Sequence, residues 1–347
     1  MIWTRRLLGL LLAALLTSTV LSLPSGAHAA KVTSGAVAAK KANPLYDFPK
    51  MPRKCVDPKL LIPQKPTRCN LNAFKAGRPT LVLWGDSHAW QMIPALRTAA
   101  RGRNVNLVAF LMGSCPAMDP ALTPAQRKAG VPACLISNDR ALRFVKDLKS
   151  HHKRVHVLLG TYWQRYLHAL RVGDTKSYHG QMAAYWKTAG PRLFRSLGRL
   201  RVGVDVDGQV VTVPNNAKNC FTQQYYAYSC NLPRKKAIRN EKGTKKWLKR
   251  QMHKLSGKPR YVNPNRMCNS KTCFARPEGT YYTFWDNQHI SASMSRHLSY
   301  VLDKTVTRAG GKGKPHGGGP VLGGGKNGGS SGGDDGGGGF CIPLITC

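Results

Sequence analysis

The chain has 347 residues, of which 42% are hydrophobic, enough to build a core, and this excludes a wholly disordered chain. Its formal net charge is +39 at pH 7. This charge predicts binding to anionic surfaces that weakens with salt, but it says nothing about fold or reaction.

Residues 1–29 have the pattern of a secretory signal peptide. Arg5 and Arg6 precede an apolar stretch over residues 7–16, and residues 27–29 have the small-x-small form of a cleavage site. The apolar stretch is shorter than the roughly 20 residues of a membrane-spanning helix, so we favour cleavage over a retained anchor. We therefore expect a secreted, extracytoplasmic protein.

Residues 30–78 are rich in Pro, Lys and Ala and predict an N-terminal linker that becomes ordered near Cys55. From residue 79 onwards, short apolar runs alternate with segments of helical periodicity. Strands are predicted over 80–84, 105–111, 155–159, 210–213 and 261–262, and helices over 89–100, 134–150, 181–200, 235–255 and 292–306. This alternation predicts an α/β domain over 79–308, with a parallel sheet covered by helices on both faces.

Residues 309–347 differ in kind from the rest of the chain. They are largely Gly, which predicts a flexible tail, and they end in an apolar loop between Cys341 and Cys347. A docking role and a dispensable tail both remain open for this segment.

Ten cysteines in an exported chain predict disulfides. Their spacing fits no zinc motif, and we expect neither a metal nor a cofactor. Proximity in the sequence suggests the pairs Cys55–Cys69, Cys115–Cys134, Cys220–Cys230, Cys268–Cys273 and Cys341–Cys347.

Ser87 lies in the run Gly85-Asp86-Ser87-His88, directly after the first predicted strand. In open parallel sheets, ligands bind at the carboxyl ends of the strands. The N–H groups at the start of the following helix favour developing negative charge, as a nucleophilic serine requires. On this run alone, Ser87 is more simply explained as a helix N-cap.

Asp286 and His289 are three residues apart, just before the last predicted helix. One helical turn brings such side chains together, so the carboxylate can orient the imidazole while its other nitrogen faces Ser87. Alone, the pair is more simply a surface cap. Its conjunction with Ser87 predicts a serine hydrolase with Ser87 as nucleophile, His289 as base and Asp286 as orienting acid. His88 is expected to be structural or to face the substrate.

These two segments, together with Gly113-Ser114-Cys115-Pro116 and the run from Gly160 to Trp163, resemble the SGNH/GDSL hydrolase family. The chain is most similar to the SGNH domains attached to bacterial acyltransferase-three membrane proteins that O-acylate cell-surface glycans. The resemblance spans about residues 78–307. It implies a flavodoxin-like three-layer α/β/α sandwich and the same three catalytic roles.

The chain departs from the family at the block Gly-x-Asn-Asp, whose Asn donates to the oxyanion. Gly160-Thr161-Tyr162-Trp163-Gln164 takes its place. The candidate oxyanion donors are then the backbone N–H groups of Ser87, Gly113 and Ser114, with the Trp163 N–H or the Gln164 amide as substitutes. For Trp163, a place in the core is the favoured interpretation.

Residues 234–260 contain twelve Lys or Arg residues and a single acid, Glu241. They predict either the solvated face of a helix or a binding surface for an anionic wall polymer. The only aromatic residue interleaved with the helical part of this stretch is Trp247, which disfavours nucleic acid as the ligand.

Together these features predict an exported O-acyl esterase or O-acyltransferase that acts on cell-envelope carbohydrate through an acyl-enzyme on Ser87. Its expected partners are an acylated glycan or an anionic cell-wall polymer, and a separate membrane acyltransferase as acyl donor. The alternative is a non-catalytic, basic envelope-binding protein on a hydrolase fold.

Overall fold

The computed structural model describes residues 46–313 apart from 58, 152, 214–230, 240 and 276–281. The chain divides into two compact units, Met1–Gly35 and Ala36–Cys347, and every described residue belongs to the second. Within the described ranges, no helix is long and apolar enough to cross a membrane. The predicted signal peptide, nearly all of the glycine-rich tail and the pairs Cys220–Cys230 and Cys341–Cys347 lie outside the described residues.

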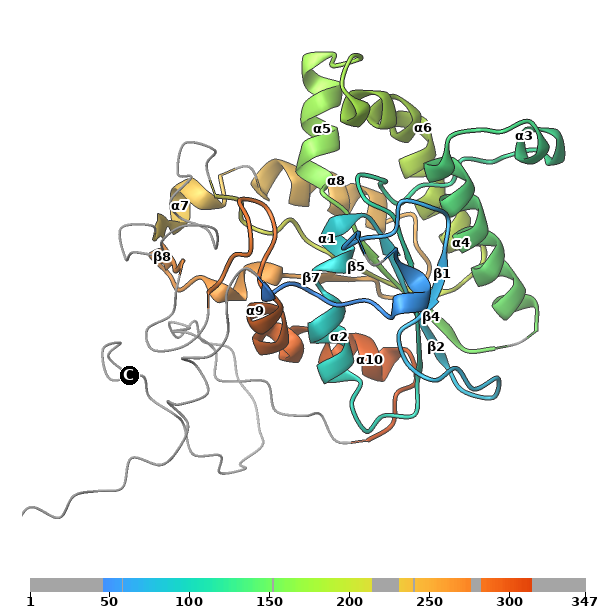
Figure 1. Ribbon diagram of the computed structural model, residues 1–347, viewed down its shortest axis with the longest axis horizontal. Coiled ribbons are helices and arrows are strands. Elements are labelled where there is room, and N and C mark those ends of the chain that lie inside the picture. Colours follow the sequence, from blue (N-terminus) through green and yellow to red (C-terminus); the bar gives the residue numbers. More distant parts are fainter. Residues whose placement is uncertain are drawn as a thin grey trace, which may run out of the picture. The chain divides into compact units, whose positions relative to one another are not determined.

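A six-stranded sheet with the order β1-β3-β2-β4-β5-β7 forms the centre of the second unit (Figure 1). The central strand β2 pairs in parallel with β3 and β4, and this register places its last residue, Gly85, opposite Gly160. β6 and β8 form a separate antiparallel pair. The strands are β1 (Arg68–Asn70), β2 (Thr80–Gly85), β3 (Asn106–Leu111), β4 (Val155–Gly160), β5 (Gly203–Asp207), β6 (Leu232–Pro233), β7 (Arg260–Val262) and β8 (Thr272–Cys273).

Helices cover both faces of the six-stranded sheet. Val82 and Trp84 of β2 belong to a buried cluster with α4, α5, α6 and α8, whereas Leu81 and Leu83 belong to one with α1, α2, α9 and α10. The predicted three-layer α/β/α fold is thereby confirmed. The helices are α1 (Ser87–Trp90), α2 (Ile93–Ala99), α3 (Pro124–Lys128), α4 (Ala133–Ser150), α5 (Trp163–Val172), α6 (Tyr178–Arg199), α7 (Arg234–Ala237), α8 (Glu241–Met252), α9 (Ala292–His297) and α10 (Asp303–Arg308), with 3₁₀-helices at Arg53–Cys55, Pro264–Met267 and Leu298–Leu302.

The sheet is mostly, but not wholly, parallel, because β1 runs antiparallel to β3. β1 lies within residues 30–78, the segment that the sequence predicted to be a linker. An antiparallel edge strand needs no crossover helix, so a short segment from outside the alternating region can join the sheet. Cys55 and Cys69 form a disulfide that ties this segment together, and Cys115–Cys134 and Cys268–Cys273 are also bonded.

The prediction of a strand over 210–213 was wrong. The strand next to β4, on the side away from β2, is β5. Buried Asp205 and Asp207 alternate with valines in β5, so its sequence has no continuous apolar run. Residues 210–213 form a buried connection instead. The N–H of Val211 donates to Asn265 Oδ1 at 2.9 Å, and that of Val213 donates to the Asn287 carbonyl at 2.7 Å. Side-chain and loop acceptors therefore replace a strand ladder here.

Three predicted helices are interrupted. The segment 89–100 divides into α1 and α2, with Pro94 in the first turn of α2, where its missing N–H costs nothing. The segment 235–255 divides into α7 and α8, and the segment 292–306 contains a 3₁₀ turn between α9 and α10. Periodicity predicted these helical segments but not their breaks.

The turn from β2 into α1 depends on a close backbone approach. Gly85 has a φ of +154°, and a Cβ atom there would lie 1.5 Å from the carbonyl oxygen of Gly160. A Cβ atom on Gly160 would in turn lie 2.9 Å from the Cα of Ala89. Only glycine fits at these two positions, where the last residues of β2 and β4 meet the first turn of α1.

We predict that Gly85→Ala lowers the free energy of unfolding by at least about 2 kcal/mol, because the added methyl group must displace β4 and adopt a disfavoured φ. Urea unfolding measures this change. Gly77→Ala is the matched control, since a Cβ atom there meets nothing within 4 Å. Equal, small effects of the two substitutions would show that the strand ends are not packed this tightly.

Candidate active site

Ser87 is the first residue of α1 and follows the sharp turn at the end of β2. The preceding residue, Asp86, caps the helix: its carboxylate accepts the N–H of His88 at 2.8 Å. A residue in the first helical turn has no intrahelical acceptor for its N–H. The half-buried Ser87 is thus placed at a helix N-terminus, where developing negative charge is stabilised.

Asp286 and His289 form the hydrogen-bonded pair expected from their spacing. The Asp286 Oδ2 atom lies 2.7 Å from His289 Nδ1. The other carboxylate oxygen accepts the N–H groups of Gln288 and His289, at 2.8 and 2.7 Å. Because the ionised carboxylate is only an acceptor, Nδ1 carries the proton, and Nε2 of the neutral imidazole is left as an acceptor.

The imidazole of His289 packs against the helix that begins with Ser87. Its ring centroid lies 5.3 Å from that of His88 and 5.8 Å from that of Trp90, and the Trp90 contact is edge-on. His289 is buried, and its Nε2 atom has no hydrogen-bond partner among the described residues. The fold therefore brings the histidine to the serine helix, although the hydroxyl–imidazole hydrogen bond is not formed. Catalytic hydrogen bonds often tighten only when substrate binds.

Gln91 joins the serine helix, α1, to the histidine loop, which is the segment from Asp286 to Ile290. No sequence motif marked this residue. Its Oε1 atom accepts the N–H of Ile290 at 2.9 Å, so its amide nitrogen faces His88 Nδ1 at 3.3 Å. This network makes Nδ1 of His88 an acceptor and places the proton on Nε2. Burial lowers the pKa of His88 well below its usual value, and repulsion from a protonated His289 would lower it further. His88 is thus a neutral, buried ring beside the Asp286–His289 pair, with an Nε2 that has no partner in the described part of the chain.

Asp86 connects the end of β4 to the serine turn. Its carboxylate accepts the N–H of Tyr162 at 3.0 Å, and the Tyr162 ring stacks on His88 at a centroid distance of 4.1 Å. Burial raises the pKa of Asp86 to about 6, against the opposing effect of the hydrogen bonds from Tyr162 and His88. The position of Asp86 next to Ser87 was the only sequence signal for this role. Tyr162 was marked only as part of the run from Gly160 to Gln164, without a role of its own.

The candidate oxyanion donors fall into two groups, according to whether their N–H already donates to another group of the protein. The N–H of Gly113 donates to the Pro63 carbonyl at 3.1 Å, and the buried indole of Trp163 donates to the Asp207 carbonyl at 2.8 Å. Both groups are therefore committed to structural bonds, and Trp163 is a core residue, as favoured. Ser114 follows β3 with a φ of 55°, a conformation that is uncommon for a residue other than glycine.

Gln164 has a different environment from Trp163. Its backbone N–H donates to Gln209 Oε1 at 3.1 Å, while its side chain lines a cavity next to Tyr162. Three candidate donors therefore make no hydrogen bond within the described ranges. They are the backbone N–H groups of Ser87 and Ser114 and the side-chain amide of Gln164.

Comparison with known proteins shows the family. A model described as "SGNH domain (fused to AT3 domains)" matches residues 54–304, well over half of the chain, and the protein therefore belongs to this SGNH domain family. This confirms the predicted resemblance. The chain is also similar to a solved structure, the periplasmic domain of a lipopolysaccharide acetyltransferase from Salmonella ser. Paratyphi A. The two are 15% identical with a TM-score of 0.46, over 67% of this chain and 85% of that one. No curated protein matches the chain.

The raised pKa of Asp86 predicts a pH dependence of stability. The folded state binds a proton on this carboxyl that the unfolded state releases above the ordinary aspartate pKa of 3.8. This proton therefore adds to the free energy of unfolding below pH 3.8, and its contribution is lost as the pH rises towards 6. We predict that the unfolding free energy of wild type falls relative to that of Asp86→Asn by up to about 3 kcal/mol over this window.

Urea unfolding of both proteins at a series of pH values from about 4 to about 7 measures this difference. The comparison cancels the titration of groups that the two proteins share, including His88. A difference that stays constant over the window would contradict the raised pKa.

Proposed function

We propose that this protein is an exported serine-dependent O-acyl esterase or O-acyltransferase that acts on cell-envelope carbohydrate. Membership in the SGNH domain family supports an acyl-transfer or esterase type of reaction. Ser87 is the proposed nucleophile, His289 the general base and Asp286 the residue that orients the base.

One observation carries this proposal: the 2.7 Å contact between Asp286 Oδ2 and His289 Nδ1 leaves the basic Nε2 atom without a partner, among the described residues, beside the helix that starts with Ser87. An imidazole held in this tautomer is poised to accept a proton. A surface cap would have no reason to bury that nitrogen against α1, since an unpaired buried polar atom costs roughly 1–3 kcal/mol.

In the proposed reaction, Ser87 Oγ attacks the ester carbonyl carbon while His289 Nε2 takes the hydroxyl proton. The tetrahedral oxyanion is stabilised by N–H donors at the start of α1. When the ester C–O bond breaks, His289 returns the proton to the leaving alcohol and an acyl-enzyme remains. Water or a sugar hydroxyl then attacks the acyl carbon and gives its proton to His289. The bond between the acyl carbon and Ser87 Oγ breaks, and His289 returns the proton to Ser87 Oγ.

Hydrolase and transferase share all of these residues and differ only in the acceptor that reaches the acyl-enzyme. The family description links such domains to AT3 domains. We propose that a separate membrane acyltransferase supplies the acyl group when a sugar is the acceptor. Three disulfides among the described residues support an oxidising compartment outside the cytoplasm.

A non-catalytic envelope-binding protein is the second candidate. It is favoured by the commitment of Gly113 and Trp163 to structural hydrogen bonds, which leaves fewer candidate donors for an oxyanion. The formal charge of +39 also suits binding to an anionic polymer without any reaction. The two candidates differ in whether Ser87 is activated.

We predict that a fluorophosphonate probe forms a single adduct on Ser87 of the folded, oxidised protein, located by intact-mass and peptide analysis. His289→Ala should slow labelling by about two to four orders of magnitude, because the general base is lost. Asp286→Asn should slow it as well, since the imidazole is then no longer held in its tautomer.

The matched controls are Ser270→Ala and His253→Ala, which alter exposed residues away from the pair. Both should label like wild type. Two results would contradict the catalytic proposal: no adduct on the folded wild type, or an unchanged labelling rate in His289→Ala. Either result would favour the non-catalytic envelope-binding protein.

A further inference from the structure

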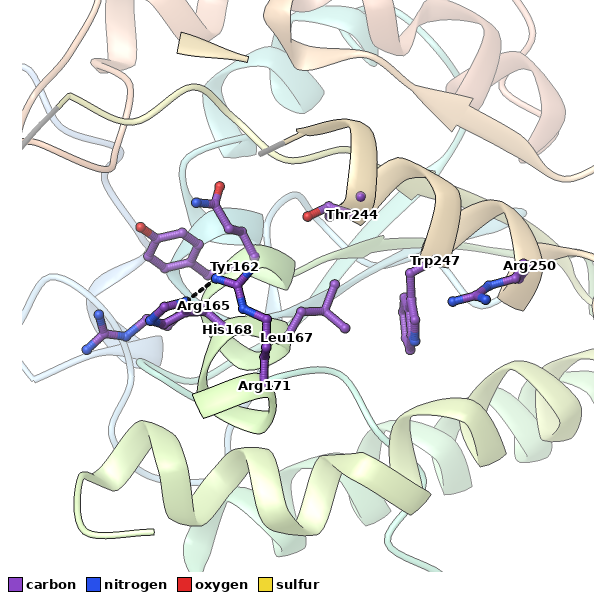
Figure 2. Close-up of a pocket in the computed structure, with 10 residues that line it drawn as sticks. Tyr162, Arg165, Leu167, His168, Arg171, Thr244, Trp247 and Arg250 are labelled. Atoms are coloured by element: carbon purple, nitrogen blue, oxygen red, sulfur yellow. Dashed lines mark hydrogen bonds between the residues drawn. The ribbon is translucent and has the colours of Figure 1, made fainter. Parts of the chain in front are cut away.

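A cavity of about 510 Å³ lies between α5 and α8, next to the candidate active site. The residues that line it come almost entirely from these two helices (Figure 2). They are Tyr162, Gln164, Arg165, Leu167, His168, Arg171, Gly243, Thr244, Trp247 and Arg250.

The lining residues follow helical spacing on both walls. Gln164, His168 and Arg171 lie four and three residues apart on α5, and Trp247 and Arg250 lie three apart on α8. Residues at these spacings share one face of a helix. The cavity is therefore built from two facing helix surfaces, as Figure 2 shows, and not from a mobile loop.

The cavity carries positive charge. Asp174, just beyond the end of α5, interacts electrostatically with Arg165 but does not line the cavity. Arg165, Arg171 and Arg250 are exposed, and no carboxylate belongs to its lining. Across the described residues, none of these three arginines has a carboxylate within ion-pairing distance. Glu241, at the start of α8, instead accepts a hydrogen bond from the Tyr261 hydroxyl at 3.2 Å. Three guanidinium groups around one hollow form a strong site for an anion, because each offers several N–H donors in a fixed plane.

Two contacts give the cavity a defined shape. Arg171 Nη2 lies 2.9 Å from His168 Nδ1, the contact drawn as a dashed line in Figure 2. Trp247 packs on Trp186 with a centroid distance of 4.7 Å and remains half-buried. The indole is thus fixed as an apolar wall against which a sugar ring can pack.

Tyr162 connects this cavity to the catalytic residues. Its ring lines the cavity and also stacks on His88, and its N–H is bound to Asp86, the residue before Ser87. A polymer chain that fills the cavity therefore passes within one side chain of the serine turn. The same substrate can then present an anionic group to the arginines and an acyl ester or acceptor hydroxyl to Ser87.

We propose that the cavity between α5 and α8 binds an anionic group, a carboxylate or a phosphate, carried by the polysaccharide on which Ser87 acts. Its role in substrate selection rests on the proposed function, whereas binding itself does not. The chemistry favours a glycan over a nucleic acid. Nucleic-acid grooves stack successive bases on exposed aromatic rings, but Tyr162 and Trp247 are both half-buried against neighbouring rings.

The test measures binding by titration calorimetry in the Ser87→Ala background, which removes turnover. The probes are an oligogalacturonate, a glycerol phosphate oligomer, a neutral dextran oligomer and a single-stranded DNA oligonucleotide, each at about 50 and about 300 mM salt. The pocket variant is Arg165→Gln, Arg171→Gln and Arg250→Gln combined. The matched control removes three exposed charges from α4 and the segment after it, by Lys146→Gln, Lys149→Gln and Lys153→Gln.

We expect the oligogalacturonate, the glycerol phosphate oligomer or both to bind more tightly than dextran. The pocket variant should lose about tenfold or more in affinity, and the control less than about twofold. The probe that responds, uronate or phosphate, identifies the anionic group. The single variants Arg165→Gln and Arg250→Gln test the same point if the triple variant misfolds. Each should lower the affinity by about two- to fivefold.

Equal losses in the pocket and control variants would overturn the proposal in favour of diffuse charge. Equal binding of dextran, or a pocket-dependent loss for DNA alone, would also overturn it. Because binding is measured without Ser87, these outcomes are independent of the fluorophosphonate result. Failure of the catalytic proposal and failure of the cavity proposal are therefore distinguishable.

Discussion

The candidate active site depends on how closely three backbone segments approach one another at the end of the central strand. Gly85 and Gly160 end β2 and β4 in adjacent positions, and neither has room for a side chain. This contact allows the chain to turn at once from β2 into α1, so that Asp86 caps the helix and Ser87 begins it. A bulkier residue at either position would move the serine away from the carboxyl edge of the sheet, where ligands of this fold class bind.

A buried polar network then holds the histidine loop against that turn. Asp86, His88 and Gln91 are all at most 1% exposed. Asp86 accepts a hydrogen bond from Tyr162 and Gln91 accepts one from Ile290, while His88 contacts the amide of Gln91. Such burial costs free energy unless the partners are in place, so the network penalises alternative positions of the loop. Its effect on function is positional: it fixes Ile290, and with it the adjacent His289, next to the serine helix.

The charge of the protein has a diffuse part and a local part. A formal charge of +39 attracts any anionic surface and cannot select among them. The cavity between α5 and α8 differs because three arginines, a fixed indole and Tyr162 converge on one hollow beside the candidate active site. Selectivity requires such convergence, since recognition of an anion depends on the placement of its donors as well as on total charge.

The sequence by itself determined the alternating α/β pattern, the serine at a strand end and the spacing of Asp286 and His289. These features are local, because the periodicity and spacing of neighbouring residues encode them directly. Only the tertiary structure decided that β1 joins the sheet antiparallel, that residues 210–213 form a loop, and that the N–H of Gly113 donates to the Pro63 carbonyl. It also decided the contact between Gln91 and Ile290, which are 199 residues apart. Contacts of this range depend on how packed layers align, and one sequence carries no local signal for that alignment.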